Sequence, residues 1–186
     1  MKPKAILIPT LVLFLVCLCV TAALAGTNML TKPIIAQLNI ETAKQSRQQV
    51  LPDAADFEEA SKGDVQYHIG KDASGQTVGY VFTNTSNSGY GGAVEVMTGI
   101  DAEGNVTGVV ILGHNETPGL GANAEKESFR DQYLQAARAE GFSLIKSGTP
   151  GDGQILAMTG ATITSNAVTE AVNQSCAQYF TVKEGA

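Results

Sequence analysis

Residues 65–85, VQYHIGKDASGQTVGYVFTNT, predict a strand, a turn and a returning strand. Residues 65–69 alternate apolar and polar side chains, as a half-buried strand does. Residues 71–76 contain Asp72, Ser74 and Gly75, which favour a turn. A second hairpin is expected further along, with strands at 91–100 and 106–113 joined by a turn. Residues 55–112 are therefore expected to form antiparallel strands.

Helical patterns follow these strands instead of alternating with them. Residues 127–141 predict a short helix with Phe129, Tyr133 and Ala136 or Ala137 facing inward. Residues 154–158 predict a last short strand, and residues 166–180 a closing helix. The inward face of that closing helix is expected to carry Val168, Ala171, Val172, Ser175 or Cys176, and Tyr179. Because strict strand–helix alternation is missing, the sequence predicts an α+β fold in which helices flank an antiparallel sheet.

Residues 5–25 form 21 positions without a charged side chain. As a helix, this length crosses about 30 Å of hydrocarbon. Lys2 and Lys4 precede it, and the positive-inside tendency places the N-terminus in the cytoplasm and the remaining chain outside. The Ala-Leu-Ala tail at 23–25 also fits the end of a cleaved signal peptide. Apolar residues continue past this tail, which favours an uncleaved anchor, and both interpretations export the domain that follows.

A second helix is expected directly after the anchor. Thr31 and Pro33 predict its start, with Thr31 as the cap and Pro33 in the first turn. The helix is expected to end before Leu51 and Pro52. The predicted organisation is a cytoplasmic N-terminus at 1–4, a transmembrane anchor at 5–26, a connecting helix and linker at 27–54, and one folded domain at 55–186.

Composition excludes several classes of function. The formal net charge is -6, and no Lys/Arg cluster is present, so nucleic acid is not expected as a partner. The three cysteines are Cys17 and Cys19 in the apolar segment and Cys176 in the closing helix. Because no Cys-x-x-Cys pair exists, neither a zinc nor an iron–sulfur site is expected. Cys176 is expected to be a small core residue.

A run of small and hydroxyl residues, TGATITS at 159–165, precedes the closing helix. Glycine lets the backbone approach a ligand closely, and the start of a helix favours a bound phosphate. The same residues also fit an ordinary helix cap with a turn in front of it. The local pattern leaves both interpretations open.

Three stretches together resemble the FMN-binding domain family. TGATITS at 159–165 resembles the family's flavin-attachment motif, HNETPGLG at 114–121 its Glu-Thr-Pro-Gly-Leu-Gly loop, and GYGG at 89–92 its entry to a central strand. The resemblance spans about residues 60–180, and the N-terminal segment also fits. Within this family the chain resembles most the G subunits of Rnf electron-transport complexes, which are related to the C subunit of the sodium-translocating NADH:quinone oxidoreductase.

The resemblance implies that Thr162 carries FMN through a phosphoester, attached by a dedicated flavin transferase. It also implies that residues 55–186 form the domain that binds FMN. Thr159, Gly160, Ala161, Thr164 and Ser165 would surround the phosphate. Glu116, Thr117, Pro118, Gly119, Leu120 and Gly121 would form a wall for the flavin ring.

Three further positions near these motifs need an interpretation. Tyr90 fits a flavin contact and an exposed bulge equally well. His114 fits a structural hydrogen-bonding residue. The family often has an Asp three positions before the first motif threonine, and Leu156 stands there in this chain. Asp152 is near but out of register.

The function implied by the resemblance is electron transfer within a membrane-bound, ion-translocating ferredoxin:NAD oxidoreductase complex. The partners would be other membrane subunits, carrying flavin and iron–sulfur centres, and the flavin domain would lie on the outer side of the cytoplasmic membrane. No catalytic residue and no metal site of its own is expected. The alternatives are a stand-alone exported flavoprotein reductase and a non-enzymatic binding domain that shares the fold.

Overall fold

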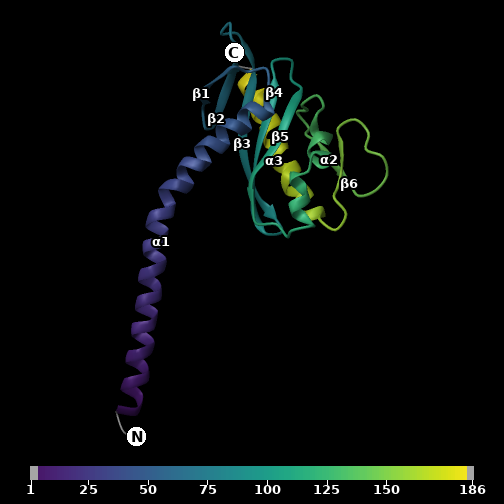
Figure 1. Ribbon diagram of the computed structural model, residues 1–186. Coiled ribbons are helices and arrows are strands. Elements are labelled where there is room, and N and C mark those ends of the chain that lie inside the picture. The colour runs from purple at the N-terminus through teal and green to yellow at the C-terminus, as the bar shows by residue number, and fades with distance from the viewer. Residues whose placement is uncertain (1–3, 184–186) are drawn as a thin grey trace. The chain divides into compact units, whose positions relative to one another are not determined.

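The computed structural model describes residues 4–183, except for the side chains of residues 4–7, 34 and 36–40 (Figure 1). The expectation for Lys2 lies outside the described residues. The chain forms two compact units, Met1–Thr42 and Ala43–Ala186. The second unit therefore begins well before residue 55, and it includes the last turns of the long N-terminal helix.

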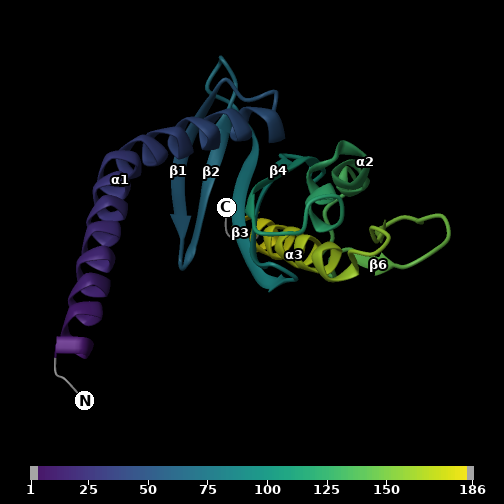
Figure 2. The same cartoon turned by 60° about the horizontal axis from the view of Figure 1, so that its bottom comes forward.

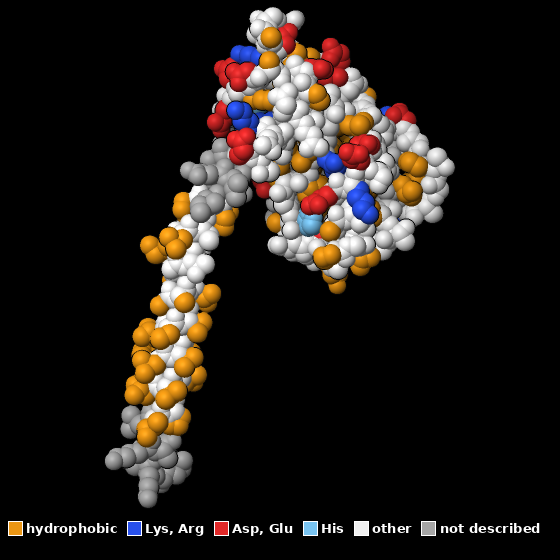
Figure 3. Space-filling view, viewed as in Figure 1, with side chains coloured by type: hydrophobic (Ala, Val, Ile, Leu, Met, Phe, Trp, Pro, Cys, Tyr) orange, Lys and Arg blue, Asp and Glu red, His pale blue; other side chains and the backbone are white. Residues whose placement is uncertain are grey.

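That N-terminal helix, α1, runs from Lys4 to Val50 without interruption. The expected helix start at Thr31 is wrong, because Thr31 lies inside α1. Its hydroxyl does not cap a helix but donates to the Thr27 carbonyl, one turn earlier, at 3.0 Å. The part Ile8–Pro33 has a mean hydropathy of 2.6 and is long and apolar enough to cross a membrane. Hydrophobic side chains lie all along its described surface, whereas charged side chains are spread over the second unit (Figure 3).

Five antiparallel strands follow in a simple meander, each paired with the next. They are β1 (Asp56–Lys62), β2 (Val65–Lys71), β3 (Thr77–Gly89), β4 (Gly92–Asp101) and β5 (Val106–His114). The two predicted hairpins are confirmed. β3 extends past the expected end at Thr85, and β1 is an additional strand on the edge of the sheet.

One face of this sheet is covered by α3 (Thr162–Lys183), which runs along β3 and β4 (Figure 2). The expected inward residues of the closing helix are buried: Val168, Ala171, Val172, Ser175, Cys176 and Tyr179. The apolar ones pack with Phe82, Val96 and Ile100 of the sheet in the main core. The helix begins four residues earlier than predicted, so Thr162 is its first residue.

The opposite face of the sheet is covered by the end of α1. Val50, Leu51 and Ala54 are almost fully buried and cluster with Val81 and Met97. The expected division between residues 54 and 55 would cut through this cluster. The sheet with helices on both faces confirms the predicted α+β class.

The segment between β5 and α3 is mostly irregular. It contains η1 (Gly121–Glu125), α2 (Glu127–Arg130), η2 (Asp131–Tyr133), and the parallel strands β6 (Ser143–Ile145) and β7 (Gln154–Leu156). The expected helix at 127–141 is therefore wrong beyond its first turns. After Tyr133 the chain extends and pairs with the β4–β5 turn, since Val106 N donates to Gln135 O and Ala137 N to Gly104 O. Phe129 and Tyr133 are buried, as predicted.

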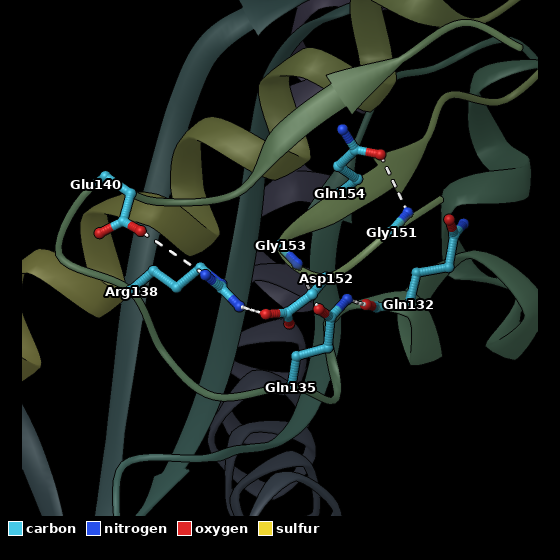
Figure 4. A network of polar contacts seen from close by, with 8 residues as sticks. All are labelled: Gln132, Gln135, Arg138, Glu140, Gly151, Asp152, Gly153 and Gln154. Atoms are coloured by element: carbon cyan, nitrogen blue, oxygen red, sulfur yellow. Dashed lines mark hydrogen bonds and ion pairs between the residues drawn. The ribbon is translucent and has the colours of Figure 1, made fainter. Parts of the chain in front are cut away.

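Polar side chains tie the loop before β7 to this irregular segment (Figure 4). Arg138 forms an ion pair with Asp152, and the Gln135 side chain accepts a hydrogen bond from the Gly153 amide at 2.7 Å. The Gln132 side chain accepts one from the Leu156 amide at 2.7 Å. These contacts hold the strand that leads into the start of α3.

Candidate functional site

A cavity of about 620 Å³ opens where α3 begins. Three segments that are far apart in sequence line it, and they are the three stretches that the sequence singled out. The lining residues are Tyr90, Glu116, Thr117, Leu120, Gly121, Gly160, Ala161, Thr162, Ile163 and Thr164. Its volume lies within the usual range for small-molecule and cofactor sites.

A tight turn delivers the chain to the start of α3. Ala161 N donates to Met158 O at 3.0 Å, and Gly160 has a φ of 76°, which favours glycine over any residue with a Cβ. The buried Ser165 hydroxyl accepts from Met158 N at 3.0 Å and donates to Ala161 O at 2.9 Å. Ser165 thus fixes the turn against the helix, and the neighbouring Thr162 side chain is exposed at the cavity.

The second wall is built on another turn with glycine at its third position. Leu120 N donates to Thr117 O at 3.1 Å, with Pro118 and Gly119 between them and a φ of 78° at Gly119. Proline followed by glycine is the preferred pair for a type II turn. The turn presents Thr117 and Leu120 to the cavity, while Pro118 and Gly119 do not line it.

The Glu116 carboxylate joins all three walls. It is only 6% exposed. Oε1 accepts a hydrogen bond from Gly91 N at 3.1 Å, next to Tyr90. Oε2 accepts one from the Thr164 hydroxyl at 2.7 Å, in the first turn of α3.

His114 holds the backbone of Glu116 through a hydrogen bond. Its Nδ1 accepts a hydrogen bond from the Glu116 amide at 3.1 Å, and its Nε2 lies 3.1 Å from Glu125 Oε1. Because Nδ1 acts as an acceptor, the proton of the neutral ring is assigned to Nε2, which donates to Glu125. His114 is therefore a structural hydrogen-bonding residue, as expected.

Large apolar side chains surround the cavity although they are exposed. Tyr90 is 73% exposed, Ile163 53% and Leu120 47%, and each comes from a different wall. Exposed apolar side chains gathered at a cavity are typical of a ligand or partner site. Ile163 was not among the predicted site residues. One feature of the sequence could have indicated it: Ile163 is an apolar residue within 159–165 that lies outside the buried face of the closing helix.

The predicted site residues fall into two groups. Nine of the thirteen line the cavity: Tyr90, Glu116, Thr117, Leu120, Gly121, Gly160, Ala161, Thr162 and Thr164. Of the other four, Pro118, Gly119 and Thr159 belong to the two turns, and Ser165 lies in the first turn of α3 with its side chain away from the cavity. The Thr164 and Ser165 hydroxyls are used in internal hydrogen bonds, whereas the structure shows no such bond for the exposed Thr162 hydroxyl within residues 4–183.

Leu156 and Asp152 take no part in the cavity. The Leu156 backbone bonds with the Gln132 side chain, and Asp152 pairs with the Arg138 guanidinium, whose hydrogen bond and charge lower the pKa of Asp152. Asp152 therefore pairs with Arg138 away from the cavity. It does not replace the carboxylate that the family pattern has at the position of Leu156.

Comparison with known proteins identifies the family. Residues 89–177 match the FMN-binding domain, and residues 1–50 match the RnfG N-terminal region. The chain is 40% identical to the G subunit of the Na(+)-translocating ferredoxin:NAD(+) oxidoreductase complex of Acetobacterium woodii, over 91% of this chain and 89% of that protein. The chain belongs to the family of G subunits of ion-translocating oxidoreductase complexes. Another member, the G subunit of the proton-translocating ferredoxin:NAD(+) oxidoreductase complex of Clostridium ljungdahlii, is 36% identical over 87% of this chain and 85% of that protein.

Solved structures share the fold of this family member. The C subunit of the Na(+)-translocating NADH-quinone reductase from Parabacteroides distasonis superposes with a TM-score of 0.55 and 21% identity, covering 75% of this chain and 81% of that one. NqrC of Shewanella oneidensis gives a TM-score of 0.54 at 21% identity, covering 69% of each chain. Both the family resemblance and the predicted fold are thus confirmed.

The cavity fits FMN by its donor groups and its surface. The first turn of α3 has backbone N–H groups without an intrahelical partner, which suit a phosphate. Thr162 offers a free hydroxyl beside them, and the three exposed apolar side chains offer a surface for a planar ring. The residues present therefore suit a phosphorylated aromatic cofactor.

Proposed function

We propose that this protein is an electron-transfer subunit of a membrane-bound, ion-translocating ferredoxin:NAD oxidoreductase complex, with FMN attached to Thr162. One observation carries the proposal. An exposed threonine hydroxyl stands at the first turn of a 22-residue helix and lines a cavity, inside the region that matches the FMN-binding domain. This is the arrangement that a phosphoester-linked flavin needs.

Each wall of the cavity has a role in this proposal. Bound FMN supplies the redox chemistry. Thr162 Oγ1 would hold FMN through a phosphoester. A separate, magnesium-dependent flavin transferase would supply the FMN part of FAD: the pyrophosphate bond of FAD would break, AMP would leave, and the threonine hydroxyl would lose its proton. The amides of residues 162–164 and the partial positive charge of the helix start favour the phosphodiester anion. Tyr90, Leu120 and Ile163 offer apolar contact to the ring.

A permanent bond suits the proposed location. The apolar part of α1 would anchor the chain in the cytoplasmic membrane, and Lys2 and Lys4 would keep its N-terminus inside. The domain that follows would then lie on the outer side, where a dissociating cofactor would be lost. The proposed division keeps a cytoplasmic N-terminus, one anchor, a connecting segment and the FMN-binding domain.

The partners would be the other membrane proteins of the complex, which carry flavin and iron–sulfur centres. Two relatives are named as members of such complexes, one sodium-translocating and one proton-translocating. Residues 5–25 contain no Asp, Glu, Lys, Arg or His. Because ion pathways in membranes use such residues, we place the ion path in the other subunits.

The test is a flavin-attachment assay on the full-length chain, produced together with a flavin transferase. The wild-type protein is expected to give a fluorescent band in a denaturing gel and a mass increase of one FMN minus one water. Thr162→Val is expected to lose both, and Thr162→Ser to keep them. Thr181→Val is a matched control, since Thr181 is an exposed threonine near the other end of α3. A fluorescent Thr162→Val band would show that the attachment site is elsewhere.

The stand-alone reductase is separated from the member of a complex by purification. We expect a tagged chain in its native membrane to bring down integral membrane proteins that contain iron–sulfur centres. Isolation of a flavin-loaded chain by itself, under conditions that preserve such complexes, would favour the reductase instead.

A further inference from the structure

Glu116 is buried at the cavity and is hydrogen-bonded at both carboxylate oxygens and at its backbone amide. A carboxylate has no donor of its own and needs donors around it when it is buried. Glu116 receives one from each of the two other walls, the Gly91 amide and the Thr164 hydroxyl. The hydrogen bond between the Glu116 amide and His114 Nδ1 fixes its backbone.

Glycines enclose the carboxylate on two sides. A Cβ on Gly89 would come within 2.8 Å of Glu116 Oε1, and a Cβ on Gly121 within 2.6 Å of Thr164 Oγ1. Gly91 also lies against the Asn115 carbonyl, with no room for a side chain. Gly89 from the GYGG stretch and Gly121 from the Glu-Thr-Pro-Gly-Leu-Gly stretch therefore leave the space that this carboxylate occupies. Gly92 and Gly119 have positive φ values instead, with open space where a Cβ would stand.

We propose that Glu116 is a positioning residue. Its carboxylate holds the β3–β4 connection at Tyr90 and Gly91, the 116–121 wall and the first turn of α3 in the arrangement that presents Thr162 before any cofactor is attached. We call the two hydrogen bonds of Glu116, from Gly91 and Thr164, the clip. The inference deepens the proposed function and rests on it for the identity of the cofactor. The hydrogen bonds themselves do not depend on a cofactor, because they join residues of this chain.

The chemistry of the clip predicts how substitutions behave. Glu116→Ala removes the acceptor of the Gly91 amide and of the Thr164 hydroxyl. The Thr164 hydroxyl is buried, and a buried donor without a partner is costly. Glu116→Gln preserves both contacts, because its carbonyl accepts from Gly91 N and its amide donates to Thr164 Oγ1. Thr164→Val removes one arm, and Thr164→Ser restores it. A charge-based role for Glu116 predicts instead that the Gln variant fails.

The experiment uses the full-length chain in detergent, produced without transferase so that no flavin is attached. Amide hydrogen exchange is measured at Gly91 and across residues 115–121. Glu116→Ala is expected to speed Gly91 exchange by at least about tenfold, the effect of losing one hydrogen bond to a charged group. Glu116→Gln is expected to stay within about threefold of wild type, a difference below the worth of one such bond. Thr164→Val is expected to accelerate exchange across 115–121, and Thr164→Ser is expected not to.

Glu170→Ala is the matched control. Glu170 also accepts a hydroxyl hydrogen bond between the sheet and α3, from Ser86 at 2.6 Å, but it does not line the cavity. It is expected to leave Gly91 exchange unchanged.

The second readout is the initial rate of flavin attachment when transferase and FAD are added. Glu116→Ala is expected to be slowed by about tenfold or more, in proportion to the lost preorganisation, and Glu116→Gln only slightly. Unchanged Gly91 exchange in Glu116→Ala would overturn the clip. So would a Gln variant that keeps wild-type exchange and is modified as slowly as the Ala variant, because the charge would then be decisive. A wild-type chain that takes up no flavin contradicts the proposed function, while the exchange rates still decide the clip.

Discussion

Thr162 and Thr164 are two residues apart on α3, yet their hydroxyls have different surroundings. Two residues along a helix correspond to a rotation of about 200°. Thr162 is exposed at the cavity, whereas Thr164 is 1% exposed and donates to Glu116. In the proposed function their roles follow from this difference: the exposed Thr162 hydroxyl forms the ester, and the buried Thr164 hydroxyl holds the first turn of α3 against Glu116.

This contrast gives a prediction for Thr162→Val. The flavin is not expected to move to Thr164, because that hydroxyl is buried and already donates a hydrogen bond. Peptide mapping by mass spectrometry after modification checks this for every hydroxyl in 159–165. Finding the flavin on Thr164 would mean that the Glu116 bond opens readily.

Cys176 predicts a specific pH dependence of stability. The thiol is fully buried among apolar side chains, and burial raises its pKa from 9.0 to about 11. The unfolded chain loses this proton at lower pH than the folded chain, so its contribution to stability is present below pH 9 and is lost as pH rises toward 11. Each pH unit in this window corresponds to about 1.4 kcal/mol.

Denaturant unfolding between pH 8 and 10.5 measures this contribution, with Cys176→Ala as the reference because alanine does not titrate. The wild-type advantage over the variant is expected to shrink above pH 9. A constant difference across the range would contradict an elevated thiol pKa.

At the scale of elements, the end of α1 contacts the sheet through two facing glycines. Gly99 on β4 and Gly108 on β5 are paired in register. A Cβ on Gly108 would come within 2.6 Å of Val50 Cα, and one on Gly99 within 2.7 Å of Val50 C. Thr107 donates to Val50 O at 2.5 Å beside them. The glycines therefore allow the backbone of α1 to lie directly on the sheet.

Gly108→Ala is expected to destabilise the domain by about 1–3 kcal/mol, the usual cost of overpacking, because the added methyl meets backbone atoms. Gly113→Ala on the same strand is the control, since a Cβ there meets nothing within 4 Å. Thermal unfolding of both variants checks this. Equal melting temperatures would mean that α1 moves off the sheet at little cost.

At the scale of the whole molecule, the chain combines an apolar helix with a domain that has its own core. The compact second unit starts at Ala43, and its core includes Val50 and Leu51, which are 0% and 1% exposed. The first unit, Met1–Thr42, contains the candidate membrane span. Removing the first unit is therefore expected to make the chain soluble without lowering the stability of the second unit.

A fragment of residues 43–186 is expected to be soluble without detergent and to unfold cooperatively, whereas the full chain needs detergent. A fragment of residues 53–186 is expected to be less stable by several kcal/mol, because it lacks two large buried side chains. Sedimentation after cell lysis and chemical unfolding measure the two properties. If expression of the full-length sequence yields a soluble product whose mass shows that its first residues have been removed, a cleaved signal peptide would be favoured.

The sequence alone determined the features that depend on local chemistry. The strand at 65–69 and the inward stripe of the last helix follow from side-chain period, and the returning strand at 77–85 follows from the turn before it. All three were predicted correctly. The motif residues around Thr162, Glu116 and Tyr90 were predicted from resemblance, and the structure brings them to one cavity. Ile163 was missed because its exposure depends on where the helix begins.

Only the tertiary structure decided the features that depend on distant partners. The predicted helix at 127–141 ends early because the chain after Tyr133 pairs with the β4–β5 turn. Helix α1 continues through Thr31, whose hydroxyl forms a hydrogen bond within the helix. The hydrogen bonds of Glu116 come from residues 25 positions before it and 48 after it. Side-chain period carries no information about such contacts, because burial and hydrogen-bond satisfaction arise only when the whole chain has folded.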